Sequence, residues 1–294
     1  PATFFAIVVY HLEGVPDRLN SQVVVVEREI YNRDQRRDEC HISAGDKFKA
    51  CLYGGSNIRA IVIGDSHAAS VVTAVQAALS SDGNGILAAS YSSCPTIFGA
   101  KVSAFEKNKC DLVNKWIFEY QKKYSSELPL IIVGRTASSA FGPSNKLLGR
   151  QGVPSVFFDE MVNVADEKFL EKFKSEYIKT VCSYQQKRQV YLLRPIPEMG
   201  VDVPKKMISK MMQGEPYEVT LNLSAYKKRQ SFVWEIQDAA SATCGVKILS
   251  TTDYLCPKEI CKSQINGRPL YYDENHLSEF GNRLLVPMFS EIFK

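Results

Sequence analysis

The chain has 294 residues, which is enough for one large domain or for one domain with an extension. Its formal net charge of +4 is small for that length and no long run of lysine and arginine occurs, which argues against a dedicated nucleic-acid-binding protein. No apolar run reaches the roughly 18 to 20 residues that a membrane-spanning helix needs. Because the sequence begins at Pro1 and not at a methionine, we expect a mature or excised fragment of a longer protein.

The first 56 residues differ in character from the rest of the chain. They begin with an apolar, β-like segment, continue through mixed charges at residues 27–39, and end at Gly54 and Gly55 after two cysteines. We therefore expect residues 1–56 to be an N-terminal extension without a core of its own, and residues 57–294 to form the main domain.

From residue 57 onward, short β-branched apolar runs alternate with longer segments of helical periodicity. The predicted strands are residues 58–63, 85–89, 128–133, 190–193 and 246–249. The predicted helices are residues 68–79, 110–124, 169–186, 223–240 and 277–293, the last kinked or divided at Pro287. This alternation predicts an α/β fold, a flavodoxin-like three-layer sandwich of about five parallel strands with helices on both faces.

Ligands of such sheets bind at the carboxyl ends of the strands. The stretch Gly64-Asp65-Ser66-His67 follows the first predicted strand, so it lies at that edge. Near the other end of the chain, Asn266-Gly267 predicts a hairpin turn that leads into residues 271–278.

The chain has eight cysteines, an even number that favours disulfides and an oxidising compartment. Many pairings are possible, and the simplest is sequential: Cys40–Cys51, Cys94–Cys110, Cys182–Cys244 and Cys256–Cys261. The alternative is eight reduced thiols in a cytosolic core. Because no C-x-x-C motif occurs and the four histidines are scattered, we expect no metal site.

Ser66 follows a strand and begins a helix, so it is either a helix cap or a nucleophile. A serine nucleophile needs a base, and the base needs an acid that orients it. Asp273 and His276 lie three residues apart before the last predicted helix, so that one loop can supply both partners. This pair favours the nucleophile.

The blocks "IGDSHAAS", "SSCP", "VGR" and "YYDENHLSEFGN" resemble the SGNH (GDSL-like) hydrolase superfamily, and most closely the SGNH domain fused to acyltransferase-3 membrane proteins. The resemblance covers about four-fifths of the chain, from residue 57 to the end, and implies that residues 57–294 are an SGNH catalytic domain. It implies that Ser66, Asp273 and His276 are the catalytic residues.

The resemblance also locates candidates for the oxyanion hole and the pocket around the nucleophile: Asp65, His67, Ser93 and Arg135. The family's second block usually supplies a glycine N–H, but the stretch around Ser93 lacks that glycine. Its third block usually supplies an asparagine, but Arg135 follows Gly134 instead. Arg135 either stabilises an oxyanion through its charged N–H donors or forms a structural salt bridge at a strand end. His67 either lines the pocket or packs at the helix start, and Asp65 can cap the helix.

By resemblance, the chain is an O-acyltransferase that moves an acetyl group through an acyl-serine to a hydroxyl of a bacterial surface polysaccharide such as lipopolysaccharide O-antigen. The resemblance implies no directly bound cofactor, with acetyl-CoA as the ultimate donor through an acyltransferase-3 membrane domain upstream in the same polypeptide. It also implies a periplasmic location tethered to the inner membrane, a polysaccharide or glycolipid acceptor, and no nucleic acid. Two alternatives remain open: a secreted carbohydrate O-acetylesterase with the same triad, and a non-catalytic glycan-binding domain.

Overall fold

The computed structural model describes residues 20–45, 47–102, 109–144, 152–215 and 217–294. The apolar start that we expected in the N-terminal extension falls within residues 1–19 and lies outside the described residues.

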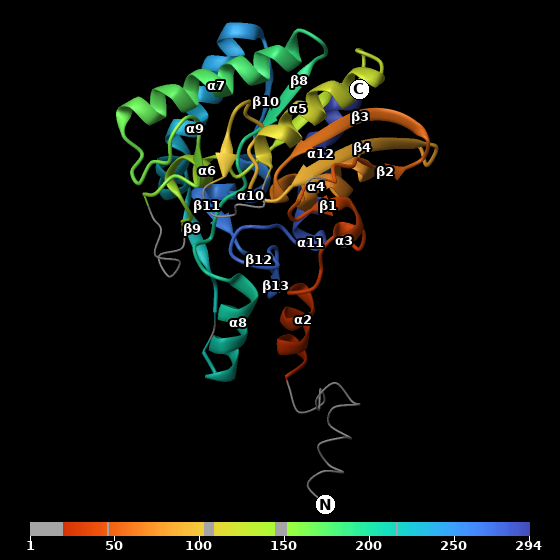
Figure 1. Ribbon diagram of the computed structural model, residues 1–294. Helices are drawn as coiled ribbons and strands as arrows, with labels where there is room; N and C mark the ends of the chain where they lie inside the picture. The colour runs from red at the N-terminus through yellow and green to blue at the C-terminus, as the bar shows by residue number, and fades with distance from the viewer. Residues whose placement is uncertain (1–19, 46, 103–108, 145–151, 216) are drawn as a thin grey trace, which may run out of the picture.

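A seven-stranded sheet forms the centre of the molecule (Figure 1). Its five main strands are all parallel and lie in the order β4, β3, β6, β8, β10. They are β3 (Asn57–Gly64), β4 (Asn84–Tyr91), β6 (Leu130–Val133), β8 (Val190–Leu193) and β10 (Lys247–Leu249). If these five strands are numbered by their position in the chain, their order across the sheet is 2-1-3-4-5. This is the flavodoxin-like order, and it confirms the predicted fold class.

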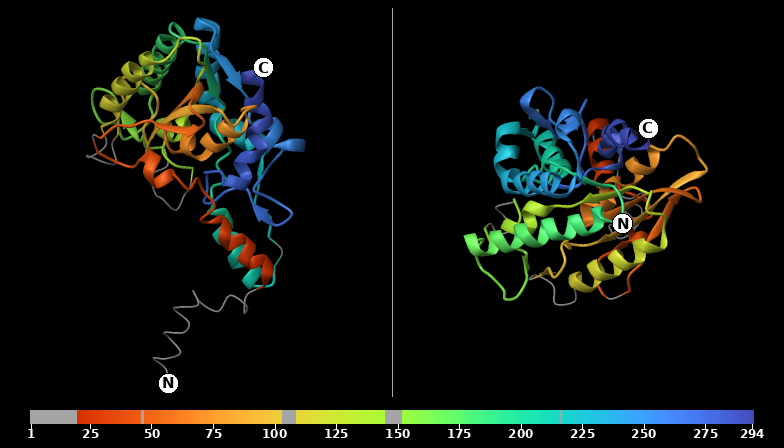
Figure 2. Two further views of the ribbon diagram at one scale, coloured as in Figure 1. Left: turned by 90° about the vertical axis from the view of Figure 1, so that its right-hand side faces the viewer. Right: turned by 90° about the horizontal axis from the view of Figure 1, so that it is seen from above.

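Helices cover both faces of the sheet, as the view from above in Figure 2 shows. On one face, α4 (Ser66–Ala77) and the C-terminal segments pack against residues such as Val62 and Val133. On the other face, α5 (Cys110–Tyr120) and α7 (Glu167–Gln185) pack against residues such as Ile61 and Ile132. The long helix α9 (Leu223–Cys244) contributes residues to both clusters. Because alternate strand residues serve opposite faces, the strands are apolar throughout their buried length.

The segment before residue 57 joins the same sheet. β1 (His41–Ile42) pairs parallel with the end of β4, and β2 (Cys51–Gly54) pairs antiparallel with its beginning. The described part of the expected extension therefore shares the core of the main domain, while the boundary at residue 57 stays a prediction. Before it, α2 (Ser21–Glu29) lies beside α8 (Val203–Met212), and the two helices project together from the body (Figures 1 and 2).

The predicted hairpin is present near the C-terminus. β12 (Gln264–Ile265) pairs antiparallel with β13 (Arg268–Pro269), and the two turn residues between them have φ values of 51° and 78°. An Asn-Gly turn supplies this left-handed backbone at low cost. The predicted last helix is divided into α11 (Glu279–Asn282) and α12 (Val286–Ser290), and Pro287 lies in the first turn of α12.

Four disulfides are present, in the sequential pairing: Cys40–Cys51, Cys94–Cys110, Cys182–Cys244 and Cys256–Cys261. They fit an oxidising compartment.

Within the described ranges, no helix combines the length and the apolar character needed to cross a membrane. The remaining short elements are α3 (Arg37–Cys40), β5 (Lys101–Val102), α6 (Thr136–Phe141), β7 (Val156–Phe157), β9 (Thr220–Asn222), α10 (Thr252–Leu255) and β11 (Ile260–Lys262).

Candidate active site

The end of β3 is shaped by Gly64 and Asp65. Gly64 has φ of 151°, and a Cβ there would lie 1.7 Å from the carbonyl oxygen of Val133, so only glycine lets β3 and β6 run this close together. The buried carboxylate of Asp65 caps α4 by accepting the His67 backbone N–H over 2.8 Å, and it also accepts the Arg135 backbone N–H over 2.7 Å. Asp65 therefore acts as a helix cap that ties together the ends of two strands. Burial raises the pKa of this carboxyl.

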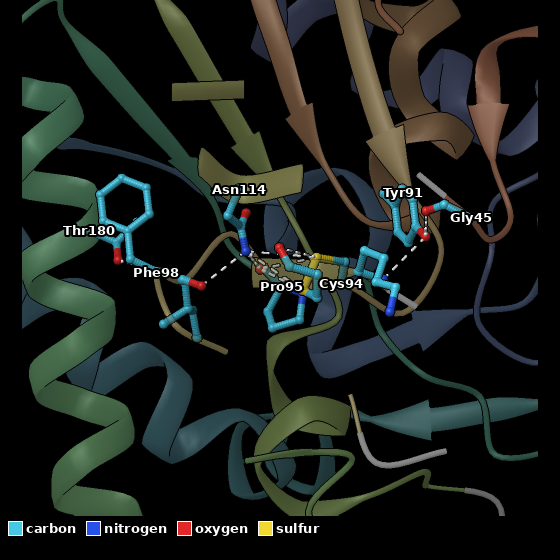
Figure 3. The surroundings of a disulfide bond; sticks show 10 residues. Gly45, Tyr91, Cys94, Pro95, Phe98, Asn114 and Thr180 are labelled. Atoms are coloured by element: carbon cyan, nitrogen blue, oxygen red, sulfur yellow. Dashed lines mark hydrogen bonds between the residues drawn. A yellow bond between two sulfur atoms is a disulfide. The ribbon is translucent and has the colours of Figure 1, made fainter. Parts of the chain in front are cut away.

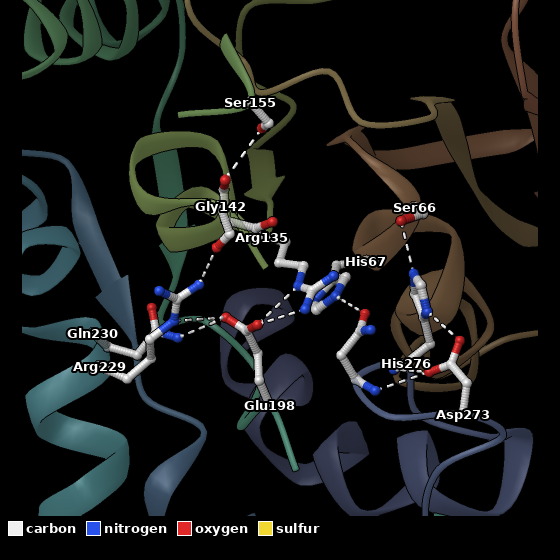
Figure 4. Close-up of polar contacts among 12 residues, drawn as sticks. Ser66, His67, Arg135, Gly142, Ser155, Glu198, Arg229, Gln230, Asp273 and His276 are labelled. Carbon is white, nitrogen blue, oxygen red and sulfur yellow. Dashed lines mark hydrogen bonds and ion pairs between the residues drawn. The ribbon is translucent and has the colours of Figure 1, made fainter. Parts of the chain in front are cut away.

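Three side chains form a continuous hydrogen-bonded line at this edge of the sheet (Figure 4). Ser66 Oγ lies 2.7 Å from His276 Nε2, and His276 Nδ1 lies 2.7 Å from Asp273 Oδ2. Ser66 is the first residue of α4, so its oxygen sits at the positive end of a helix dipole. The arrangement can pass the Ser66 proton to His276 while Asp273 fixes the orientation of the imidazole.

Asp273 holds the loop that carries the imidazole as well as the ring itself. Its Oδ1 accepts the backbone N–H groups of Asn275 and His276, each over 2.8 Å. Burial alone would raise the pKa of Asp273, but the hydrogen bond from His276, that residue's charge and the two backbone donors lower it to about 2. The carboxylate is therefore ionised at neutral pH, as an acid that orients the base must be.

The C-terminal segment is docked on α4 by polar contacts beyond the loop. Glu279 accepts the Thr73 hydroxyl over 2.8 Å, and the Asn282 amide donates to the Ser70 carbonyl over 3.0 Å. Both Thr73 and Ser70 belong to the helix that begins with Ser66. Two parts of the chain that lie about 200 positions apart are thus held in one register, which positions the nucleophile against the base.

Rings pack on two sides of the His276 imidazole. Tyr272 stacks on it with the planes 2° apart and the centroids 5.3 Å apart, while the His67 ring lies 4.8 Å away. His67 is buried, and its Nε2 is hydrogen-bonded to Asn275 Oδ1 over 2.8 Å. Burial lowers the pKa of His67 to about 3, so this ring is neutral. Of the two interpretations of His67, the structure shows packing at the helix start, against the base.

A pocket of about 110 Å³ adjoins the nucleophile, and it is lined by Asp65, Ser66, Ser93, Val102, Arg135, Ser138, Ser139 and Ser155. The structure therefore brings Ser93 and Arg135 to the same pocket as Ser66. Ser93 has φ of 58°, a left-handed backbone that favours glycine, at the place where the family pattern has glycine. Ser93 therefore holds a backbone conformation that a glycine adopts without strain.

A disulfide and the side-chain amide of Asn114 hold the loop that carries Ser93 (Figure 3). Cys94 is bonded to Cys110 at the start of α5. The buried amide of Asn114 donates to the carbonyls of Pro95 and Ile97, over 3.0 Å and 2.9 Å. These contacts add a side-chain donor to two carbonyls that also accept backbone N–H groups, and they fix the loop against α5.

The Arg135 guanidinium forms an ion pair with Glu198. Its Nε and Nη2 lie 3.0 Å and 2.6 Å from Glu198 Oε2, and the Glu198 side chain is only 1% exposed. Arg229 Nε lies 3.5 Å from the other carboxylate oxygen (Figure 4). Burial acts to raise the pKa of Glu198, but the charges of Arg135 and Arg229 outweigh it and lower the pKa to about 2. The structural salt bridge that the sequence left open is thus present, and Arg135 also lines the pocket.

Sequence reasoning missed Glu198, Asn275 and Tyr272. Glu198 lies in the segment that leaves the carboxyl end of β8, and that placement was the signal that could have identified it. Asn275 and Tyr272 lie within the last quoted block but carry no pattern of their own. Among the described residues, one group has metal-ligand types close together, Glu39 with Cys40 and Cys51, and its two sulfurs form a disulfide.

A flavodoxin-like sheet with a Ser–His–Asp relay at the carboxyl edge of its strands defines a serine-dependent acyl-transfer domain of the SGNH type. The serine begins the helix after β3, and the other two residues precede the last helices. The chain belongs to the family described as "SGNH domain (fused to AT3 domains)", whose model matches residues 36–291. The predicted resemblance is confirmed, and membership makes the chain an acyltransferase- or esterase-type domain of a family whose members are fused to acyltransferase-3 domains.

Two solved structures are similar to this chain, and the first of them shows a related fold. The periplasmic domain of a lipopolysaccharide acetyltransferase from Salmonella ser. Paratyphi A is 15% identical, with 92% of this chain and 97% of that chain covered and a TM-score of 0.61. The C-terminal catalytic domain of peptidoglycan O-acetyltransferase A from Streptococcus pneumoniae, solved with a methylsulfonyl adduct, is 12% identical, with 81% and 93% covered and a TM-score of 0.36. No curated protein matches the chain at a significant level.

Proposed function

We propose that this chain is the periplasmic O-acetyltransferase domain of a membrane acyltransferase, and that it acetylates a hydroxyl of a cell-surface polysaccharide such as lipopolysaccharide O-antigen. The observation that carries the chemistry is the relay from Ser66 through His276 to Asp273, with both hydrogen bonds at 2.7 Å. Membership of the family fused to acyltransferase-3 domains supports the membrane partner. The name of the Salmonella structure supports the acceptor and the compartment.

In the first half of the reaction, His276 Nε2 takes the proton from Ser66 Oγ, and Oγ attacks the carbonyl carbon of the acetyl donor. The tetrahedral intermediate collapses, the leaving group takes the proton from His276, and acetyl-Ser66 remains. The ultimate donor is acetyl-CoA, used on the cytosolic side of the membrane partner, so this domain binds no cofactor of its own. In the second half, the sugar hydroxyl gives its proton to His276 and attacks the acetyl carbon, which releases Ser66.

The oxyanion of each intermediate needs donors in the pocket beside Ser66. The backbone N–H of Ser66 at the start of α4 and the backbone N–H of Ser93 are the candidates, because both residues line that pocket. Arg135 supplies positive charge to the same pocket while Glu198 holds its guanidinium. In this proposal, Arg135 takes the place of the asparagine that the family pattern has here, without being an amide donor.

The test uses the whole chain with a small acetyl ester as donor and an oligosaccharide as acceptor. Ser66 should be labelled by a serine-directed phosphonate, and acetylated oligosaccharide should appear by mass spectrometry. Ser66→Ala should abolish both while the far-ultraviolet circular dichroism stays unchanged. An active Ser66→Ala variant would refute Ser66 as the nucleophile. A wild-type chain that resists the phosphonate and acetylates nothing would leave the non-catalytic glycan-binding domain. Acetate release without any acetylated sugar would favour the esterase.

A further inference from the structure

A second and much larger cavity lies beyond the Arg135–Glu198 ion pair. It has a volume of about 980 Å³, at the upper end of the range of small-ligand sites. We call it the α9 cavity. Its walls include Phe141, Glu198, Leu221, Tyr226, Lys228 and Arg229. The residues come from α6, from the segment after β8, from β9 and from one face of α9. A cavity of this size next to a reaction centre can hold several sugar units.

One ion pair lies between the α9 cavity and the pocket beside Ser66. Arg135 lines the pocket beside the nucleophile, and its partner Glu198 lines the α9 cavity. Figure 4 shows the sequence of side chains from Ser66 past Arg135 to Glu198 and then to Arg229. A ligand in the α9 cavity is therefore separated from the pocket beside Ser66 by one ion pair, which makes this cavity the candidate place for the remainder of a polymeric acceptor.

The charges on the wall are unbalanced. Among the described residues that line it, Glu198 is the one acidic residue, and that carboxylate is already shared between Arg135 and Arg229. Arg229 Nη2 also donates to the Gly142 carbonyl, but its buried Nε has no hydrogen bond and only the 3.5 Å ion pair. Lys228 has an exposed side chain with no ion pair inside the described part of the chain. In the described lining, Lys228 and Arg229 therefore carry two positive charges, and the one carboxylate beside them also pairs with Arg135.

We propose that the α9 cavity binds a segment of the acceptor glycan that carries negative charge, a carboxylate or phosphate on its sugars. This rests on the proposed function and specifies the substrate class of the same site. A carboxylate or phosphate would give Lys228 an ion-pair partner and would add a second anion for Arg229, which already pairs with Glu198. Charge-assisted hydrogen bonds of this kind are the strong ones. The apolar walls at Phe141 and Leu221 would cover the C–H faces of the sugar rings, as apolar walls with a few polar groups do in ligand sites.

The test measures binding to the whole chain by calorimetry, with a short oligomer of galacturonic acid as the probe and the neutral galactose oligomer of matched length beside it. The acidic oligomer should bind more tightly than the neutral one. Lys228→Glu should weaken the acidic oligomer by about tenfold or more, because it replaces attraction by repulsion at the wall, and it should affect the neutral oligomer little. Ala225→Trp, which adds bulk to the same wall without charge, should weaken both.

The matched control is Lys227→Glu, which makes the same change in charge. Lys227 is the exposed neighbour on the same helix and does not line the cavity. It should leave binding of the acidic oligomer within about twofold of wild type. Equal binding of the two oligomers, no binding of either, or equal loss in the two lysine variants would overturn the inference.

The outcome is separable from the proposed function. Labelling of Ser66 by the phosphonate tests the chemistry and does not involve the α9 cavity, whereas oligomer binding can be measured on Ser66→Ala. Labelling without charge-selective binding refutes the cavity alone. If Ser66 is not labelled but the chain still binds the acidic oligomer selectively, and Lys228→Glu removes that selectivity, the proposed transferase is refuted and the glycan-binding site is retained.

Discussion

His67 Nε2 and Asn275 Oδ1 lie 2.8 Å apart, and each residue is only 1% exposed. The bond joins the residue after the proposed nucleophile to the residue before the proposed base, across 208 positions of sequence. Because burial lowers the pKa of His67 to about 3, the ring stays neutral and donates from Nε2 to the amide oxygen. The contact therefore holds α4 against the His276 loop whatever proton His276 carries during the reaction.

Removing this contact should slow the chemical step. Asn275→Ala leaves a buried N–H of His67 without its acceptor and loosens the loop, so kcat for a small acetyl ester should fall by about tenfold while KM changes by less than about twofold. Steady-state kinetics on the whole chain measure both constants. Because loss of folded protein would also lower the apparent kcat at an unchanged KM, kcat is expressed per Ser66 that the serine-directed phosphonate labels, and the fall should persist on that basis.

Asn57→Ala is the matched control for that variant. Asn57 donates to the Asn84 side chain over 2.7 Å at an exposed position, so the same type of amide is removed far from the relay. Its kcat should equal that of wild type. An unchanged kcat in Asn275→Ala, or an equal fall in both variants, would show that the buried bond does not position the base.

The parts of this molecule that the sequence predicts are those with a local pattern. The strand at residues 190–193 is recognised because a short apolar run between polar segments is typical of a buried parallel strand. Ser66 and the pair Asp273 and His276 are recognised because their types, order and context agree. β1 and β2 are too short to show a period, and their place in the sheet depends on pairing with β4. Glu198 is an isolated acid whose partner Arg135 lies 63 positions away, so only the fold brings them together.

The Glu198 carboxylate should make the free energy of unfolding fall as the pH is lowered. Its pKa falls from 4.5 to about 2 on folding, so the stabilisation is complete above pH 4.5 and is lost as the pH falls toward 2. The free energy of unfolding should lose roughly 3 kcal/mol over that window from this group. Glu198→Gln leaves Arg135 and Arg229 without their counter-ion, so it should be about 3 kcal/mol less stable at neutral pH. Its stability should also decline less steeply in acid.

Urea unfolding at a series of pH values measures both effects. The control is Glu235→Gln, because Glu235 is exposed and pairs with Lys174 at the surface. That variant should stay within about 0.5 kcal/mol of wild type and keep the wild-type acid slope. If Glu198→Gln and wild type decline in parallel between pH 4.5 and 2, the ion pair is not what makes the fold acid-sensitive.

Ser93 should be the place where the chain tolerates glycine best. Its φ of 58° costs a side-chain-bearing residue about 1 kcal/mol relative to glycine, so Ser93→Gly should stabilise the fold by up to that amount. The variant keeps the backbone N–H that we propose for the oxyanion hole, so activity should be retained. Ser93→Val should destabilise by more than about 1 kcal/mol, because a β-branched residue fits this backbone worst.

Thermal and urea unfolding of the two variants, with kcat on the acetyl ester, test this expectation. Ser80→Val provides the comparison, since Ser80 is exposed and has no positive φ. A Ser93→Val variant as stable as Ser80→Val would show that the loop relaxes to another backbone. An inactive Ser93→Gly variant would instead show that the hydroxyl, and not the backbone, is what the pocket needs.

The disulfides should differ in what they contribute, because they close loops of different length. Cys182–Cys244 spans 62 positions and joins α7 to the end of α9, whereas Cys256–Cys261 spans only 5. The chain-entropy account assigns about 4 kcal/mol to the first loop and about 2 kcal/mol to the second. Replacing both cysteines of a pair by alanine should therefore cost more at the long loop, measured by urea unfolding under oxidising conditions. The reverse order would mean that native packing around the short loop, and not the freedom of the unfolded chain, sets the contribution of these bonds.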